Sequence, residues 1–125
     1  MSERAGRLTT SFRDRSKKYA SDVIKLFAAL PKGRDEVKIL GKQLLRSGTS
    51  VAAHLREASR ARSDMEFISK LGGAIQEADE STLWLELLRE DCGIASDLTA
   101  PLEKESSELI AILTTMIKRT KRPEG

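Results

Sequence analysis

Apolar residues recur every three or four positions in four separate segments, the spacing that places them on one face of a helix. In the first segment Tyr19, Val23 and Phe27 share such a face, and Pro31 predicts the end of the helix. The whole pattern predicts helices over about residues 13–30, 35–61, 64–92 and 99–120. The chain is therefore predicted to be all-α.

The second and third predicted helices form a hairpin around a polar turn. Ser63 followed by Glu66 is typical of a capping box, in which the hydroxyl accepts an amide hydrogen bond at the start of a helix. Residues equally far from the turn lie level in an antiparallel hairpin, which places Gly48 near Gly72 and Gly73. We expect the two backbones to approach closely there.

The same pairing places Arg46 level with Glu77 and Glu80, which predicts an ion pair within the hairpin. The two carboxylates share a helix face and could resemble an acid–base pair, but the arginine offers a plainer explanation. His54 is expected to form a hydrogen bond at a helix or subunit interface. We interpret these four residues as a structural polar cluster.

Turn and capping residues predict where the third helix ends and where the fourth begins. Gly93 suits the end of the third helix, Asp97 or Thr99 could cap the fourth, and Pro101 would lie in its first turn. Because short connections force neighbouring helices to be antiparallel, residues 13–122 are predicted to form an up-down-up-down four-helix bundle. Residues 1–12 show no period and are predicted to be a basic, flexible N-terminal arm.

The hairpin sequence also resembles a known family. Its first arm reads QLLRSGTSVAAHLREA, and the second follows the pattern S..MEFISKL..AIQEADEST.WLELL. Both are similar to the signature of the 23S rRNA-intervening-sequence protein family, named for reading frames in intervening sequences of bacterial large-subunit rRNA genes. The sequence departs from that signature at His54, where Asn is usual, and at Gly72 and Gly73, where better helix formers are usual.

The resemblance implies an up-down-up-down four-helix bundle that assembles as a homopentamer. A related bundle is the accessory variability protein of diversity-generating retroelements, which works with a reverse transcriptase and nucleic acid. A reverse transcriptase is therefore one partner that the resemblance suggests.

Composition narrows the class of protein. A chain of 125 residues is long enough for one core, and 33% charged with 4% aromatic residues is typical of an aliphatic helical bundle. The start of the sequence lacks the apolar run of a signal peptide, and no segment approaches the about 20 apolar residues of a membrane span, so we expect a cytoplasmic protein with no membrane contact. The single cysteine, Cys92, is predicted to be a small buried apolar residue.

No catalytic or cofactor site can be assembled from the sequence. A di-metal carboxylate centre in a bundle needs two Glu-x-x-His pairs, and this chain has one histidine, His54. A phosphate-binding glycine loop and a Ser-His-Asp set are also missing. We therefore expect a protein that is not an enzyme and needs no cofactor.

Basic residues gather at one predicted end of the bundle. In the predicted topology the start of the first helix, the second turn and the end of the fourth helix lie together. We call this end the basic pole, and its cations are Arg4, Arg7, Arg13, Arg15, Lys17, Lys18, Arg56, Arg60, Arg62, Lys118, Arg119, Lys121 and Arg122. These 13 cations face six acidic residues, a net charge of +7, while the rest of the chain carries −4.

Two explanations for the basic pole remain open. Cations at the C-terminal ends of the second and fourth helices complement the helix dipole and need no ligand. Those from Arg13 to Lys18 lie at a helix N-terminus, where the dipole disfavours them, so an acidic partner such as RNA or DNA is the alternative to solubility alone. With only Phe12 and Tyr19 nearby for base stacking, such binding is expected to be dominated by phosphate contacts.

The third helix is apolar on more than one side, because Leu83, Trp84 and Leu87 widen its stripe. This width predicts a subunit interface, with a wide intramolecular stripe as the alternative. The preferred interpretation is an oligomeric nucleic-acid-binding accessory or scaffold. The other is a protein–protein interaction scaffold, such as a partner of a reverse transcriptase, without a direct nucleic-acid role.

Overall fold

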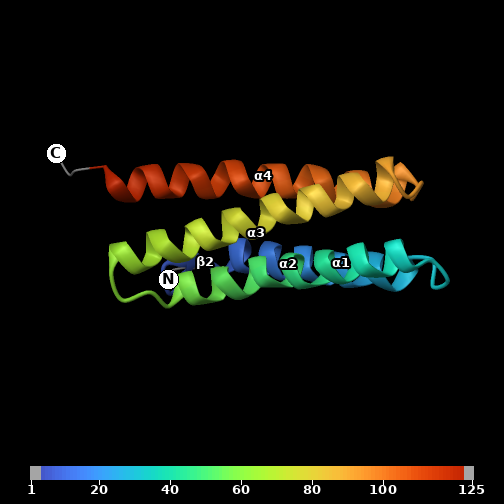
Figure 1. The fold of residues 1–125 in the computed structure, drawn as a ribbon. Helices are drawn as coiled ribbons and strands as arrows, with labels where there is room; N and C mark the ends of the chain where they lie inside the picture. The colour runs from blue at the N-terminus through green and yellow to red at the C-terminus, as the bar shows by residue number, and fades with distance from the viewer. Residues whose placement is uncertain (1–3, 123–125) are drawn as a thin grey trace.

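The computed structural model describes residues 4–122, and four long helices form almost all of this part of the chain. They are α1 (Thr10–Ala29), α2 (Asp35–Ser59), α3 (Asp64–Glu90) and α4 (Ser96–Lys121). Successive helices run in opposite directions, and the α2–α3 turn and the end of α4 lie at the same end of the molecule (Figure 1). The predicted all-α, up-down-up-down four-helix bundle is confirmed.

The apolar stripes predicted from the sequence form the core. Val37, Leu44 and Leu55 of α2 and Leu71 and Leu85 of α3 are fully buried. Burial of a leucine-sized side chain contributes roughly 1.5–3 kcal/mol, so this seam is the main source of stability for the hairpin. Cys92 is also buried, as its helical phase predicted.

A layer of hydroxyl groups crosses this apolar core. The hydroxyl of Tyr19 lies 2.6 Å from Ser106 Oγ, and Ser47 Oγ lies 2.7 Å from Ser81 Oγ. Each of the four helices contributes one member, and all four side chains are buried. Burial raises the pKa of the Tyr19 phenol, and the hydroxyls of Ser106 and Ser81 partly offset the rise, so the phenol stays neutral at physiological pH.

The close approaches between helices differ from those predicted. Glycines do not face one another across the hairpin; each makes room for a side chain instead. A methyl group at Gly48 would lie 2.7 Å from Val23 Cγ2 of α1, and one at Gly73 would lie 2.8 Å from the His54 ring. Gly72 has open space beside it, since no atom lies within 4 Å of such a methyl group. The prediction paired residues by their distance from the turn, and this distance does not show which face of each helix points toward the other.

Part of the segment predicted to be a flexible arm has regular secondary structure in the described residues. The strands β1 (Arg4–Ala5) and β2 (Leu8–Thr9) form an antiparallel hairpin, and Thr9 caps α1 by accepting a hydrogen bond from the amide of Phe12 at 3.1 Å. Leu8 is only 2% exposed. The helix therefore begins three residues earlier than predicted, because a threonine cap and a buried leucine outweigh the basic composition of the segment.

The hairpin is attached to the end of α2. The amide of Arg7 donates to the carbonyl oxygen of Ser59 at 2.8 Å. Gly6 turns the chain with a φ of +83°, and a side chain there would collide with the same carbonyl, so this position requires glycine. Strand pairing and this anchor hold the first described residues against the α2–α3 turn.

The other helix ends confirm some capping predictions and correct others. Ser63 accepts a hydrogen bond from the amide of Glu66 at 3.0 Å, as predicted, although the Glu66 carboxylate accepts from the amide of Arg62 rather than from that of Ser63. Gly93 has a φ of +71° and follows α3, also as predicted. Neither Asp97 nor Thr99 caps α4, because the helix begins before both of them, at Ser96, and its first turn excludes Pro101.

We expect Gly72 and Gly48 to respond oppositely to replacement by alanine, according to the space beside each. Gly72→Ala should raise the free energy of unfolding by up to about 1 kcal/mol, because alanine loses less backbone entropy in a helix. Gly48→Ala should lower it by about 1–3 kcal/mol, because Val23 is buried and cannot yield. Urea unfolding of both variants checks this, and destabilisation by Gly72→Ala would contradict the described packing.

Candidate nucleic-acid interface

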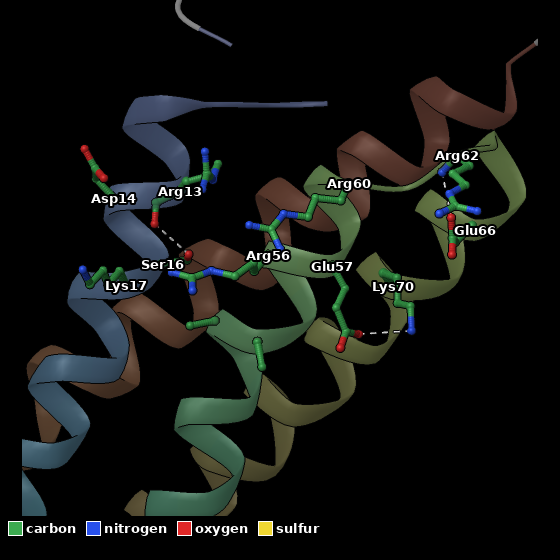
Figure 2. A pocket seen from close by; sticks show the side chains of 12 residues that line it. Arg13, Asp14, Ser16, Lys17, Arg56, Glu57, Arg60, Arg62, Glu66 and Lys70 are labelled. Carbon is green, nitrogen blue, oxygen red and sulfur yellow. Dashed lines mark hydrogen bonds and ion pairs between the residues drawn. The ribbon is translucent and has the colours of Figure 1, made fainter. Parts of the chain in front are cut away.

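A groove of about 900 Å³ lies at the basic pole between α1, α2 and the start of α3 (Figure 2). It is the junction of three elements that the up-down topology brings to one end of the bundle. We call it the basic groove, and its lining residues are Arg13, Asp14, Ser16, Lys17, Ala52, Ala53, Arg56, Glu57, Arg60, Arg62, Glu66 and Lys70.

Cations outnumber acids in the basic groove by six to three. Arg13 and Lys17 come from one face of α1, one turn apart, while Arg56 comes from the last turn of α2 and Arg60 is the C-cap residue that follows it. Within residues 4–122 none of these four side chains forms an ion pair. Their charge is therefore available to an anion from outside the chain.

The acidic residues of the groove are partly engaged by neighbours. Glu57 forms an ion pair with Lys70 at 3.1 Å across the hairpin, and a Glu66 carboxylate oxygen accepts the Arg62 amide at 2.7 Å. Lys70 was not among the residues predicted for the basic pole. It lies within one helical turn of the level of Glu57 across the hairpin, so pairing by distance from the turn could have found it.

Two of the predicted pole cations bind acids of the bundle instead. Arg15 donates to both carboxylate oxygens of Glu105, at 2.7 and 2.8 Å, and to Glu108 at 2.9 Å. The hydrogen bond to Glu105 raises the pKa of the Arg15 guanidinium further. Lys18 forms an ion pair with Asp22 one turn along α1, at 2.8 Å. Both side chains point away from the groove because they occupy other faces of α1.

Arg7 is also engaged within the fold. Its guanidinium donates to the carbonyl oxygen of Ala61 at 3.1 Å and to Asp64 at 2.8 Å, and it lies over the ring of Phe67, 5.3 Å from the centroid. One arginine thus contacts three residues at the α2–α3 turn. Its charge is used to hold the α2–α3 turn rather than to remain free.

The remaining pole cations lie outside the groove lining. Arg4 belongs to strand β1. The cations at the end of α4 are exposed and lie at the same end of the molecule as the α2–α3 turn (Figure 1); they are Lys118, Arg119, Lys121 and Arg122. They form a second basic surface at this pole, separate from the groove.

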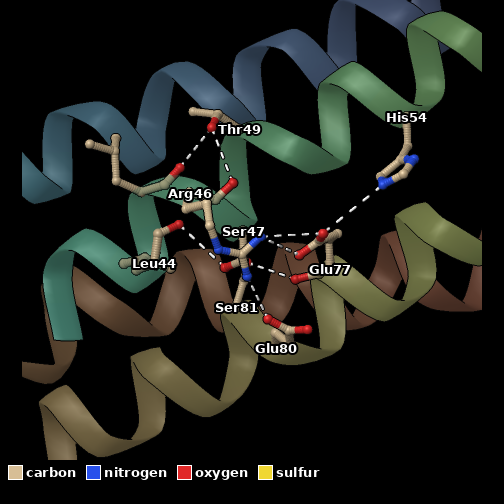
Figure 3. Close-up of polar contacts among 9 residues, drawn as sticks. Leu44, Arg46, Ser47, Thr49, His54, Glu77, Glu80 and Ser81 are labelled. Atoms are coloured by element: carbon tan, nitrogen blue, oxygen red, sulfur yellow. Dashed lines mark hydrogen bonds and ion pairs between the residues drawn. The ribbon is translucent and has the colours of Figure 1, made fainter. Parts of the chain in front are cut away.

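The structural polar cluster lies further along the hairpin (Figure 3). Arg46 contacts Glu80 at 2.7 Å and Glu77 at 3.3 Å, so the predicted ion pair is present. His54 Nε2 lies 4.0 Å from Glu77, which is longer than a hydrogen bond, and Nδ1 has no partner among the described residues. A hydrogen bond from His54 across a subunit interface stays a prediction.

The predicted interface residues differ in exposure. Leu83 is 46% exposed, whereas Trp84 and Leu87 are partly buried. Trp84 packs against the core, and its indole nitrogen is buried without a hydrogen-bond partner among residues 4–122. Leu83 is therefore the residue of this set that is most available to another subunit.

Residues 4–122 contain no group of three or more His, Cys, Asp or Glu side chains placed to hold a metal ion. None of the helices there has the length and apolar character that crossing a membrane requires.

Comparison with known proteins identifies the family. The family model described as 23S rRNA-intervening sequence protein matches residues 10–115. This chain belongs to that family. The match begins at the first residue of α1 and ends in the last turns of α4, so it covers the bundle but not the N-terminal hairpin.

A solved structure supports the family assignment. It is a crystal structure of a protein with unknown function from the S23 ribosomal protein family of Bacteroides thetaiotaomicron VPI-5482. It is 36% identical to this member of the family, with a TM-score of 0.78, and the alignment covers 85% of this chain and 97% of that one. The comparison with curated proteins gave no match.

We expect Arg15 and Arg13 to differ in their effect on stability. Arg15→Gln should lower the free energy of unfolding by roughly 1 kcal/mol, since it leaves Glu105 and Glu108 without their partner at a partly exposed site. Arg13→Gln should change it by less than about 0.5 kcal/mol, because no ion pair is lost. Thermal or urea unfolding distinguishes them, and equal effects would show that the Arg15 contacts do not hold α1 to α4.

Proposed function

We propose that this protein is a non-enzymatic, cytoplasmic accessory or scaffold that binds RNA or DNA through the basic groove. The observation that carries the proposal is the convergence of Arg13, Lys17, Arg56 and Arg60 on one groove without ion-pair partners in residues 4–122. Like charges held close together repel one another, so the arrangement costs stability unless an anion is bound.

The helix dipole explains only half of this arrangement. Arg56 and Arg60 lie at the C-terminal end of α2, where the dipole favours cations. Arg13 and Lys17 lie in the first two turns of α1, where it disfavours them, and α1 has no acidic residue in its first turn. A bound polyanion explains the cations on both α1 and α2, because phosphates would neutralise all of them.

The end of α4 agrees with a nucleic-acid ligand. The exposed cations at the end of α4 extend the positive surface beyond the groove, which suits an extended ligand better than a compact anion.

We further propose that the protein self-associates as a homopentamer. Leu83 is exposed on α3, and Leu87 lies one turn further along the same face. Copies arranged in a ring would present several basic grooves in the same direction and would bind a long polyanion more tightly than a single copy.

A protein partner is the second candidate. The exposed apolar side chains Ile39, Met65 and Leu83 favour it, because large apolar groups on a surface often mark a contact with protein. A reverse transcriptase is one such partner. This scaffold would bind without using the basic groove, so groove variants separate the two candidates.

Replacing two groove cations should weaken nucleic-acid binding. Arg56→Gln with Arg60→Gln is expected to lower the affinity for RNA or DNA roughly tenfold and to reduce the slope of log affinity against log salt by roughly 1.5. Fluorescence anisotropy at several salt concentrations measures both quantities.

A matched control changes the same charge on the same helix. Lys38→Gln with Lys42→Gln removes two exposed cations from the other end of α2 and should leave both quantities nearly unchanged. If both double variants lose the same affinity, the loss depends on the net charge of the protein and not on the basic groove. An unmodified protein that binds neither nucleic acid at low salt would exclude this function and favour the protein scaffold.

Self-association should depend on the exposed α3 face. Light scattering of the unmodified protein is expected to give a mass near five times the 13.8 kDa of one chain. Leu83→Glu should reduce that mass without unfolding the bundle, because the side chain is 46% exposed in one copy. A monomer for the unmodified protein at micromolar concentration would assign the wide α3 stripe to intramolecular packing.

A further inference from the structure

We propose that the basic groove recognises the phosphate backbone of base-paired nucleic acid and makes no use of the bases. This inference rests on the proposed function and adds the kind of nucleic acid that the groove takes. It follows from which side chains the pole exposes and which it buries.

The pole offers no aromatic surface to an unpaired base. None of the residues that line the groove is aromatic. The aromatic residues of α1 and α3 that lie nearest this pole are used in the core, since Phe12, Tyr19 and Phe67 are 9%, 1% and 7% exposed. The ring of Phe67 is in addition covered by the Arg7 guanidinium.

This absence matters most for single strands. Proteins that hold single-stranded nucleic acid gain about 1–3 kcal/mol for each base stacked on an aromatic side chain. A single strand in the basic groove would gain no such stacking energy, because the lining offers no aromatic side chain. In a duplex the bases stay stacked on one another, so binding requires no such compensation.

The free cations suit an ordered row of phosphates. Arg13 and Lys17 project from α1, and Arg56 and Arg60 project from α2, so the two walls are rigid helices rather than loops (Figure 2). A planar guanidinium can donate two parallel hydrogen bonds to one phosphate. Because a duplex holds its phosphates in fixed positions, less conformational freedom is lost than when a flexible strand is ordered.

The acids of the groove limit how far a ligand can enter. Two of its three carboxylates face the α2–α3 turn and α3: Glu57 of α2 is paired with Lys70, and Glu66 of α3 accepts the Arg62 amide. These two carboxylates repel phosphate from that side, and the third, Asp14, lies on α1. The phosphate-binding positions therefore lie between α1 and α2, where a backbone can bind while the bases remain outside.

The experiment compares four probes with equal numbers of phosphates on the full-length protein. They are a DNA duplex, an RNA duplex, a DNA single strand, and the same DNA strand with every base removed. We expect both duplexes to bind about tenfold more tightly than the single strand. The strand without bases should bind within about twofold of the strand that carries them, because the bases are not contacted.

The two single strands carry the same charge, so comparing them isolates any contribution of the bases. If the strand with bases binds much more tightly than the strand without them, or more tightly than the duplexes, the groove reads bases and this inference is wrong, while nucleic-acid binding stands. If no probe binds at low salt, the proposed function fails together with the inference. Tighter binding of one of the two duplexes would identify the ligand as RNA or as DNA, and the phosphate backbone would be the binding group in either case.

Arg13→Gln with Lys17→Gln tests the same point through the α1 wall. This double variant should reduce duplex affinity more than Lys38→Gln with Lys42→Gln, which removes equal charge from the far end of α2. It should leave the ratio between the two single strands close to one. A change in that ratio would show that these cations contact bases, as arginine can by stacking.

Discussion

Four buried hydroxyls, one from each helix, limit how the bundle can be arranged. An unpaired hydroxyl in an apolar core costs about 1–3 kcal/mol, and the Tyr19 hydroxyl finds its partner on another helix, at Ser106. The hydroxyls of Ser47 and Ser81 pair across the hairpin, and all three serines also bond to carbonyl oxygens of their own helices. Apolar stripes alone tolerate sliding of one helix past another by a turn, because leucines can exchange neighbours. The hydroxyl layer restricts that freedom, because its bonds join α1 to α4 and α2 to α3 at fixed positions.

The arginines of the basic pole show how neighbouring positions on one helix acquire different roles. Arg13 and Arg15 are two residues apart on α1 and so point in directions about 200° apart. One lines the groove, and the other reaches Glu105 on α4. The partner of Arg15 is 90 residues away in sequence, which is why charge counting along the chain could not separate a structural arginine from a free one.

The N-terminal hairpin adds a link between the first residues and the groove. Arg7 holds the carbonyl oxygen of Ala61 and the carboxylate of Asp64, on either side of the segment that carries Arg62. Leu8 also contributes to the core. Deletion of the first residues would therefore remove core packing and a turn anchor as well as charge, so side-chain replacement is the cleaner way to study the groove.

The sequence by itself determined the helices, their order and their alternation, because hydrophobic periodicity, caps and short connections are local properties of the chain. It also determined that three clusters of cations meet at one pole and that Arg46 faces Glu77 and Glu80, since both follow from counting along antiparallel helices. Only the tertiary structure decided which face of each helix meets which neighbour. That decision placed Val23 against Gly48, ordered the supposed arm through a β-hairpin, and divided the cations between ion pairs and an open groove. Contacts between residues far apart in sequence depend on the rotation of each helix about its own axis, and packing of the whole core sets that rotation.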